Sequence, residues 1–158
     1  MSILSAHSPR LQHYFEEYQS FHQDPTNRIA HWVGVPLLIL GLLGLLSFLQ
    51  FGPPFLGNLL AWDAGFILCV VATLFYLWLD WPLGLPFSLV FIGFYICGKQ
   101  LMLANAWPLL GGLFLAGWIL QIIGHSQFEK KAPAFLKSGE HILVGPLWIF
   151  ARLIGYYR

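Results

Sequence analysis

The chain has 158 residues, of which 58% are apolar and only 9% are charged, and its mean hydropathy is +0.68. A soluble domain usually carries about 25% charged residues, so this chain has too little polar surface to cover a water-soluble fold. Its 8 Lys and Arg residues nearly balance its 7 Asp and Glu residues, which leaves no long-range field to attract nucleic acid. Length and composition predict one membrane domain over residues 1–158, and they exclude most soluble enzymes and nucleic-acid-binding proteins.

The N-terminal region is polar and has two helix signals. Apolar side chains from Leu11 to His22 recur at helical spacing, with charged side chains such as Glu16 on the other face. This pattern predicts an amphipathic helix on the membrane surface. Asp24 followed by Pro25 is typical of an N-cap and the first residue of a new helix. We assign residues 1–30 to a cytoplasmic amphipathic segment that leads into the first membrane span.

Residues 31–128 form the predicted transmembrane bundle, since residues 32–128 hold only three of the 15 charged side chains. Breaks at Gly52-Pro53-Pro54 and at Asp80-Trp81-Pro82 divide this region. The expected spans are residues 32–51, 59–79, 81–98 and 105–125, and about 20 apolar residues suffice to cross a bilayer. Spans two and three are short, so a re-entrant pair is the alternative. The fold class expected is an all-α, polytopic helical bundle with about four transmembrane helices.

Residues 129–158 are expected to form a loop and an interfacial helix at the cytoplasmic face. The helix covers residues 142–157, where Trp148, Tyr156 and Tyr157 resemble an aromatic belt. With four spans, both termini and the Asp80 turn share one side, which carries seven Lys and Arg residues against Lys99 alone on the other. The positive-inside rule then makes both termini cytoplasmic, in a bacterial inner membrane or an endoplasmic reticulum.

Four histidines are expected to meet at this cytoplasmic face. They are His22, His31, His125 and His141, and each lies at an end of a predicted helix or span. Neutral imidazole binds iron, zinc or copper, and its second nitrogen usually needs an orienting partner. The alternative is that interfacial histidines bond to backbone or water and fix the depth of the helices. A group of four in a chain so poor in polar residues makes a metal site an equal alternative to this structural interpretation.

Three further polar residues lie next to these histidines. Asn27 precedes His31 by four residues, and Glu129 follows His125 by four, so each can orient or ligate on the same helical face. Arg28 lies one turn from His31 and could bind a substrate carboxylate bidentately or extend to lipid phosphate. Arg28, Asn27 and Glu129 are therefore the candidate catalytic residues beside the histidines.

Searches for known catalytic motifs narrow the chemistry. The chain contains no H-E-x-x-H zincin motif, no Glu-x-x-His pair of a di-iron bundle, no G-x-S-x-G elbow and no P-loop. His22-Gln23-Asp24 matches the His-x-Asp start of a 2-His-1-carboxylate iron site. The helix-capping function of Asp24 is the better explanation of that match.

Two segments carry a family resemblance. Residues 22–36 resemble the signature H-x-x-P-x-N-R-x-x-H-x-x-G-x-P of the 2-hydroxy fatty acid dioxygenases of fungi and bacteria. Residues 121–134 are similar to the stretch Q-x-x-G-H-x-x-F-E-x-x-x-P-A of the same family. His141, within His-Ile-Leu-Val-Gly-Pro, resembles a block associated mainly with bacterial members. The rest of the chain matches the family in hydropathy and layout.

The resemblance implies an Fe(2+)-dependent membrane enzyme of fatty acid α-oxidation. Such an enzyme shortens a long-chain 2-hydroxy fatty acid by one carbon with O₂, and the metal ligands carried over are His22, His31 and His125, with His141 as the fourth candidate. The alternatives are a non-catalytic membrane scaffold or lipid-binding protein with structural histidines, and a membrane zinc hydrolase. The expected partners are the fatty acid, O₂ and the bilayer, without nucleic acid; chain length, oligomeric state and the number of metal ions stay open.

Overall fold

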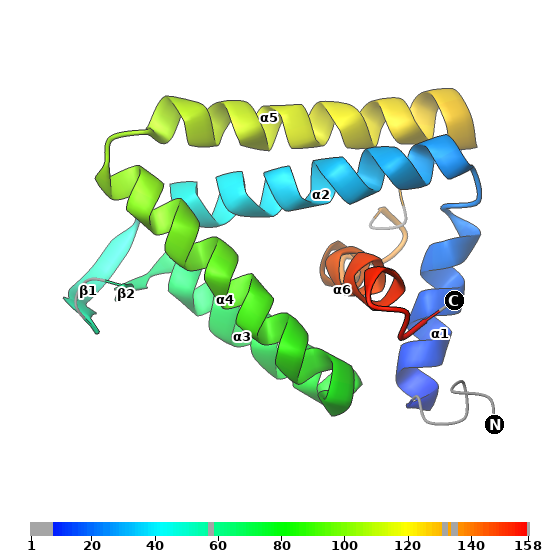
Figure 1. The fold of residues 1–158 in the computed structure, drawn as a ribbon, viewed down its shortest axis with the longest axis horizontal. Coiled ribbons are helices and arrows are strands. Elements are labelled where there is room, and N and C mark those ends of the chain that lie inside the picture. The colour runs from blue at the N-terminus through cyan, green and yellow to red at the C-terminus, as the bar shows by residue number, and fades with distance from the viewer. Residues whose placement is uncertain (1–7, 57–58, 131–132, 134–135, 158) are drawn as a thin grey trace.

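The computed structural model describes residues 8–56, 59–130, 133 and 136–157. Two long antiparallel helices, α2 (Pro25–Leu46) and α5 (Trp107–Ile123), lie side by side along the longest axis of the molecule (Figure 1). A second pair, α3 (Ala64–Leu79) and α4 (Trp81–Leu103), packs obliquely against α2. Helices α1 (Pro9–Ser20) and α6 (His141–Leu153) lie at the end where α2 begins. The all-α fold class is confirmed.

Small residues allow the long helices to approach closely. A Cβ on Gly117 of α5 would lie 2.7 Å from the carbonyl oxygen of Gly34 on α2. Farther along α2, a Cβ on Gly98 of α4 would lie 2.8 Å from the Cα of Gly44. Glycine contacts of this kind are common between membrane helices, because dispersion forces need close backbone contact where no hydrophobic effect operates.

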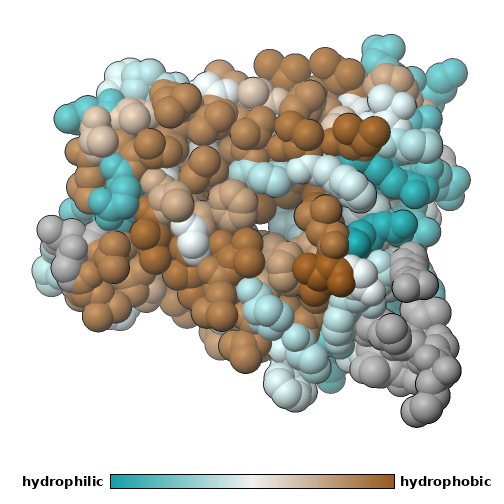
Figure 2. Space-filling model, in the orientation of Figure 1, coloured by the Kyte–Doolittle hydropathy of each residue, from teal (hydrophilic) through white to brown (hydrophobic). Residues whose placement is uncertain are grey.

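In the part of the chain that the structure describes, three helical segments are long and apolar enough to cross a membrane: Pro25–Leu46, Trp81–Leu103 and Trp107–Glu129. Figure 2 shows hydrophobic residues over much of the visible face of the long helices, with polar residues gathered toward the end that carries α1 and α6. Helix α3 has only 16 residues, about 24 Å. Four spans therefore stay a prediction, as does the cytoplasmic placement of both termini.

The second predicted span begins later than expected, because a hairpin precedes it. Strand β1 (Gln50–Phe55) pairs antiparallel with β2 (Leu60–Asp63), and the register is irregular between Gln50 and Pro54. Proline has no backbone N–H to donate, which accounts for the irregular ladder. The first span also ends earlier than predicted, at Leu46. Hydropathy predicts one helix over residues 32–51, but the last two of these residues belong to β1.

Both flanking helices are present, and their apolar faces pack against each other. Leu11, Phe15 and Tyr18 of α1 are buried, and the Tyr18 ring lies 5.4 Å from that of Trp148 on α6. Trp148 is completely buried, so its predicted place in an exposed aromatic belt is wrong. The seam between α1 and α6 removes from lipid the apolar face that was expected to rest on the membrane.

The turn between α3 and α4 lies beside both ends of the described chain. The Asp80 carboxylate accepts hydrogen bonds from the Ser8 N–H and the Tyr156 hydroxyl. Asp80 also caps α4 by accepting from the Leu83 N–H. The expected grouping of this turn with the two chain ends is therefore present, although Lys131 and Arg158, counted in the charge argument, lie outside the described residues.

Candidate metal centre

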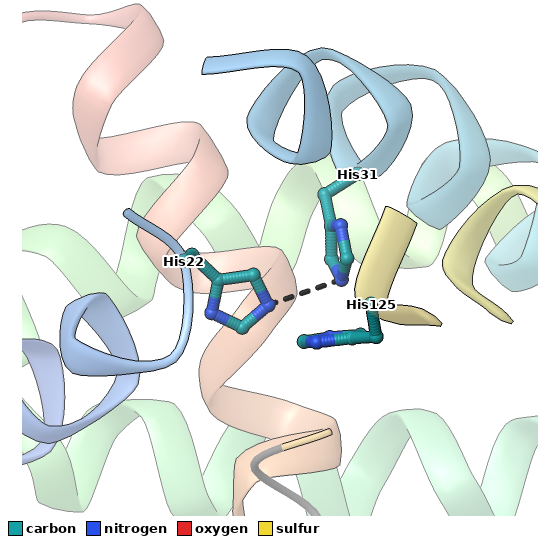
Figure 3. A group of neighbouring side chains, drawn as sticks. All are labelled: His22, His31 and His125. Atoms are coloured by element: carbon teal, nitrogen blue, oxygen red, sulfur yellow. Dashed lines mark hydrogen bonds between the residues drawn. The ribbon is translucent and has the colours of Figure 1, made fainter. Parts of the chain in front are cut away.

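Three buried histidines converge where α1, α2 and α5 meet (Figure 3). His22 lies in the loop after α1, His31 lies in the second turn of α2, and His125 lies in a π-helical extension of α5, η2 (Gly124–Glu129). One nitrogen of each ring lies within 4.8 Å of the corresponding nitrogen of the other two. Of the four histidines that were expected to meet, these three lie together.

Backbone carbonyls hold two of the rings in one orientation. Nδ1 of His22 lies 2.8 Å from the Tyr18 carbonyl oxygen, and Nδ1 of His31 lies 2.9 Å from that of Asn27. A carbonyl can only accept, so each Nδ1 carries the proton and donates it. The tautomer is then fixed, and Nε2 of each ring presents a lone pair, as in most protein metal sites.

The two Nε2 atoms lie 3.1 Å apart. Burial, together with the neighbouring His31, lowers the pKa of His22 to about 2, so that ring is neutral at physiological pH. Neither Nε2 then has a proton to share, and two lone pairs face each other. Two nitrogens bound at right angles about 2.1 Å from one ion would be about 3.0 Å apart, so a cation between them fits this spacing.

His125 supplies a third nitrogen that needs a partner. Its Nδ1 is buried and has no hydrogen-bond partner among the described residues. Buried polar atoms are nearly always paired, so an unpaired imidazole nitrogen beside two other histidines fits a metal ligand. The π-helix that carries His125 is itself unusual, because such turns are rare and often occur at functional sites.

Glu129 joins the two segments that carry His31 and His125. Its Oε1 accepts from the Asp24 N–H at 2.7 Å and from the Asn27 side-chain amide at 3.2 Å. The backbone carbonyl of Asn27 in turn accepts the hydrogen bond from Nδ1 of His31. This arrangement favours orientation over direct ligation by Glu129. Asp24 caps α2 by accepting from the N–H groups of Thr26 and Asn27, as its capping assignment predicted.

Arg28 braces the loop that carries His22. Its Nε donates to the His22 carbonyl at 2.9 Å, and its terminal nitrogen donates to the Gln23 carbonyl at 2.8 Å. Arg28 is not among the described residues that line the cavity next to the histidines. The expected contact between Arg28 and a substrate carboxylate stays a prediction that this placement does not favour.

His141 lies on the same cavity but outside the three-histidine group. Its Nε2 lies 3.5 Å from a carboxylate oxygen of Glu17 on α1. The ring of Tyr18 is nearly parallel to both His22, at 4.0 Å, and His141, at 6.3 Å between centroids. Helical periodicity predicted Tyr18 only as part of the apolar face of the N-terminal helix. Its position four residues before His22, the same spacing as Asn27 to His31, was the available signal.

The histidines lie at one end of an apolar cavity of about 290 Å³. Its walls come from α1, α2, α3, α4, α5 and α6, and only a few lining side chains besides the histidines are polar. One of these is Gln121, which lies one turn before His125. The side-chain amide nitrogen of Gln121, Nε2, is buried without a hydrogen-bond partner among the described residues. A cluster of ring nitrogens thus adjoins a space suited to a long apolar molecule.

Comparison with known proteins identifies the family. The model of the family described as "2-hydroxy-palmitic acid dioxygenase Mpo1-like" matches residues 8–157. The chain belongs to the Mpo1-like family. It is similar to the 2-hydroxy-palmitic acid dioxygenase MPO1 of Saccharomyces cerevisiae, with 27% identity over 135 residues, which cover 84% of this chain and 72% of the yeast protein. No solved structure matches the chain.

Membership of the Mpo1-like family confirms the resemblance stated from the two sequence signatures. It also supports, at the level of the family, the expectation of a 2-hydroxy fatty acid dioxygenase. Both signature segments contribute to the buried centre, since residues 22–36 carry His22 and His31 and residues 121–134 carry His125. A metal is suggested by the donor set, while its identity belongs to the proposal below.

Proposed function

We propose that this chain is an Fe(2+)-dependent dioxygenase that shortens long-chain 2-hydroxy fatty acids by one carbon with O₂. The observation that carries the proposal is the buried group of His22, His31 and His125, with two ring nitrogens fixed as acceptors, at the head of an apolar cavity. The family description and the name of the yeast relative supply the substrate class.

The overall reaction balances without a further reductant. A 2-hydroxy acid, R–CHOH–COOH, and O₂ give R–COOH, CO₂ and water. Oxidative cleavage of the C1–C2 bond supplies all four electrons that O₂ accepts. Iron(II) on three protein ligands would supply open positions for the substrate oxygens and O₂. The protein excludes water, since the three rings are almost completely buried.

Each side chain has a defined part in this proposal. His22, His31 and His125 hold the ion, and His141 remains a fourth candidate on the cavity wall. Asn27 and Glu129 position the rings through the hydrogen bonds described above. Arg28 positions the His22 loop through two backbone carbonyls. Positioning groups of this kind typically change metal affinity or activity by about 10–100-fold.

The membrane supplies the substrate. Among the described residues, three helices are long and apolar enough to span a bilayer, and all three, α2, α4 and α5, line the cavity. The fatty acid would keep its tail among these helices and bring its carboxylate to the polar end that carries α1 and α6. We place the centre at the cytoplasmic face because seven of the eight cations are predicted there.

The test is metal content together with substrate turnover in detergent-purified protein. The proposal predicts near-stoichiometric iron, O₂ consumption on addition of 2-hydroxypalmitate, and a product one carbon shorter. Bound zinc with O₂-independent turnover would instead indicate a hydrolase. Absence of any metal after anaerobic reconstitution with iron(II), without turnover, would indicate structural histidines and a scaffold.

A further inference from the structure

The cavity follows one face of α2 and one face of α5. Along α2 its lining residues are His31, Val35, Leu38, Ile39 and Leu42. Along α5 and η2 they are Phe114, Trp118, Gln121 and His125. Steps of three and four residues keep each set on one side of its helix. The two helices are antiparallel (Figure 1). His31 and His125 therefore share one end, while Leu42 and Phe114 share the other, where Gly41 packs on Phe114.

Leu42 and Phe114 are the lining residues farthest from the histidines along α2 and α5. Tight helix packing lies next to them and just beyond. A Cβ on Gly41 would lie 2.8 Å from the Cβ of Phe114, and one on Gly44 would lie 2.7 Å from the completely buried side chain of Leu110. Gly98 of α4 packs on the backbone of Gly44 at the same level, so the cavity lining ends at Leu42 and Phe114.

The length between the two ends can be compared with an acyl chain. Eleven residues separate His31 from Leu42, which corresponds to about 16 Å of helix. An extended acyl chain advances about 1.25 Å per bond, given bonds of about 1.52 Å and angles near 111°. The distance therefore accommodates about 13 carbon–carbon bonds.

The polar end of a fatty acid can face only the histidines. A carboxylate at the Leu42 end would be buried among aliphatic and aromatic side chains without a hydrogen-bond donor, which is very costly. The direction of the ligand is therefore fixed, with its terminal methyl group toward Leu42 and Phe114. This direction rests on the function proposed above.

We propose that Leu42 and Phe114 form the floor of the acyl cavity and set the longest chain that the enzyme accepts. Neither residue lies in the two sequence signatures, and neither touches the histidine group. Gly65 of α3 packs on the Leu43 carbonyl, which places Leu68, one turn later, beside the same end as a third wall. The floor residues determine specificity through volume alone, without a part in the chemistry.

The experiment measures binding and turnover separately in the full-length protein in detergent. Binding of palmitate and decanoate, which lack the 2-hydroxyl, is titrated on metal-free wild type, Leu42→Trp and Leu115→Trp. Leu115 is a matched control on α5, because its side chain is exposed on the outward face. Turnover of 2-hydroxypalmitate and 2-hydroxydecanoate is then measured on the iron-loaded proteins.

We expect Leu42→Trp to lower the affinity for palmitate at least about tenfold relative to decanoate, because an indole displaces several methylenes from the cavity. The kcat/KM ratio for the two hydroxy acids should shift in the same direction, and Leu115→Trp should leave both ratios unchanged. If Leu42→Trp binds neither acid, the Phe114→Ala variant provides the test. Removing the Phe114 ring deepens the cavity, so the affinity for eicosanoate relative to palmitate should rise.

An unchanged palmitate-to-decanoate ratio in Leu42→Trp overturns the proposal. So does an equal shift in Leu115→Trp, or a Phe114→Ala variant that gains nothing for eicosanoate. Wild type that binds palmitate but consumes no O₂ would contradict the proposed function instead, while the binding ratios would still test the floor.

Discussion

The carboxylate of Glu129 accepts a hydrogen bond from the side-chain amide of Asn27 at 3.2 Å, across 102 residues of sequence. The same oxygen accepts the Asp24 N–H, so one carboxylate binds two donors at the start of α2. Asn27 also holds the His31 ring through its carbonyl. A change at Glu129 therefore reaches the metal centre without removing a ring nitrogen.

Replacing Glu129 with alanine should lower metal affinity by about 10–100-fold, because the first turn of α2 and the end of η2 lose their common acceptor. Metal affinity is measured by competition with a chelator of known strength. Glu16→Ala, an exposed carboxylate on α1, is the control. Complete loss of the metal in Glu129→Gln, which keeps one oxygen acceptor, would instead indicate direct ligation.

Alanine at His22, His31 or His125 should abolish bound metal, since each removes one of three converging nitrogens. Metal content per chain is measured by plasma mass spectrometry. The exposed His13→Ala serves as the control. We expect His141→Ala to keep its metal, because His141 lies outside the three-histidine group and its Nε2 is 3.5 Å from the Glu17 carboxylate; loss of the metal in that variant would make His141 the fourth ligand.

Gly124→Ala should weaken the centre by crowding. The added Cβ would collide with the Asn27 side-chain oxygen, so either the Asn27 side chain or the two helices must shift at the residue next to His125. We expect a loss of about 1–3 kcal/mol in stability together with reduced metal content. Gly111→Ala on the same helix meets nothing within 4 Å and should be neutral or slightly stabilising by thermal melting.

Arg28→Met separates two assignments of that side chain. Loss of its hydrogen bonds to the His22 and Gln23 carbonyls should loosen the loop, so metal affinity and kcat fall while KM for the 2-hydroxy acid stays nearly constant. Direct binding of the substrate carboxylate predicts the opposite pattern, in which KM rises strongly and metal content is unchanged. Both quantities are measured on the same preparation.

Removal of the metal should lower the melting temperature. The lone pairs of His22 and His31 then face each other at 3.1 Å without a cation. A ligand present at 100 times its Kd stabilises the folded state by about 2.7 kcal/mol. Anaerobic iron(II) should restore the melting temperature of chelator-treated wild type but not that of His125→Ala. Equal melting temperatures with and without metal would contradict a structural contribution from the ion.

The sequence predicted the meeting of His22, His31 and His125 because charge distribution and span lengths fix the ends of helices. It also predicted the cap of α2, since Asp24 and Pro25 act locally. Such features depend on a few neighbouring residues or on the bilayer thickness. They can be inferred without knowing how the helices pack.

Other features depend on contacts between distant segments and were not predicted. The π-helical turn that carries His125 was not predicted, and neither were the hydrogen bonds that Glu129 accepts from the start of α2. The hairpin around Pro53 lies within an apolar run that resembles a span. The burial of Trp148 follows from the packing of α6 on α1, which amphipathic periodicity alone does not distinguish from lipid contact.

The centre joins a loop near the N-terminus to a turn that follows the last long helix. During synthesis, His22 and His31 leave the ribosome long before His125. The face of α2 that carries Gly34 and Gly41 is covered only after α5 has been made. The ion can bind with full affinity only after η2 has emerged and folded. On the proposed function, metal loading would be a late step of biogenesis, and a chain truncated before residue 125 would lack the third histidine of the centre.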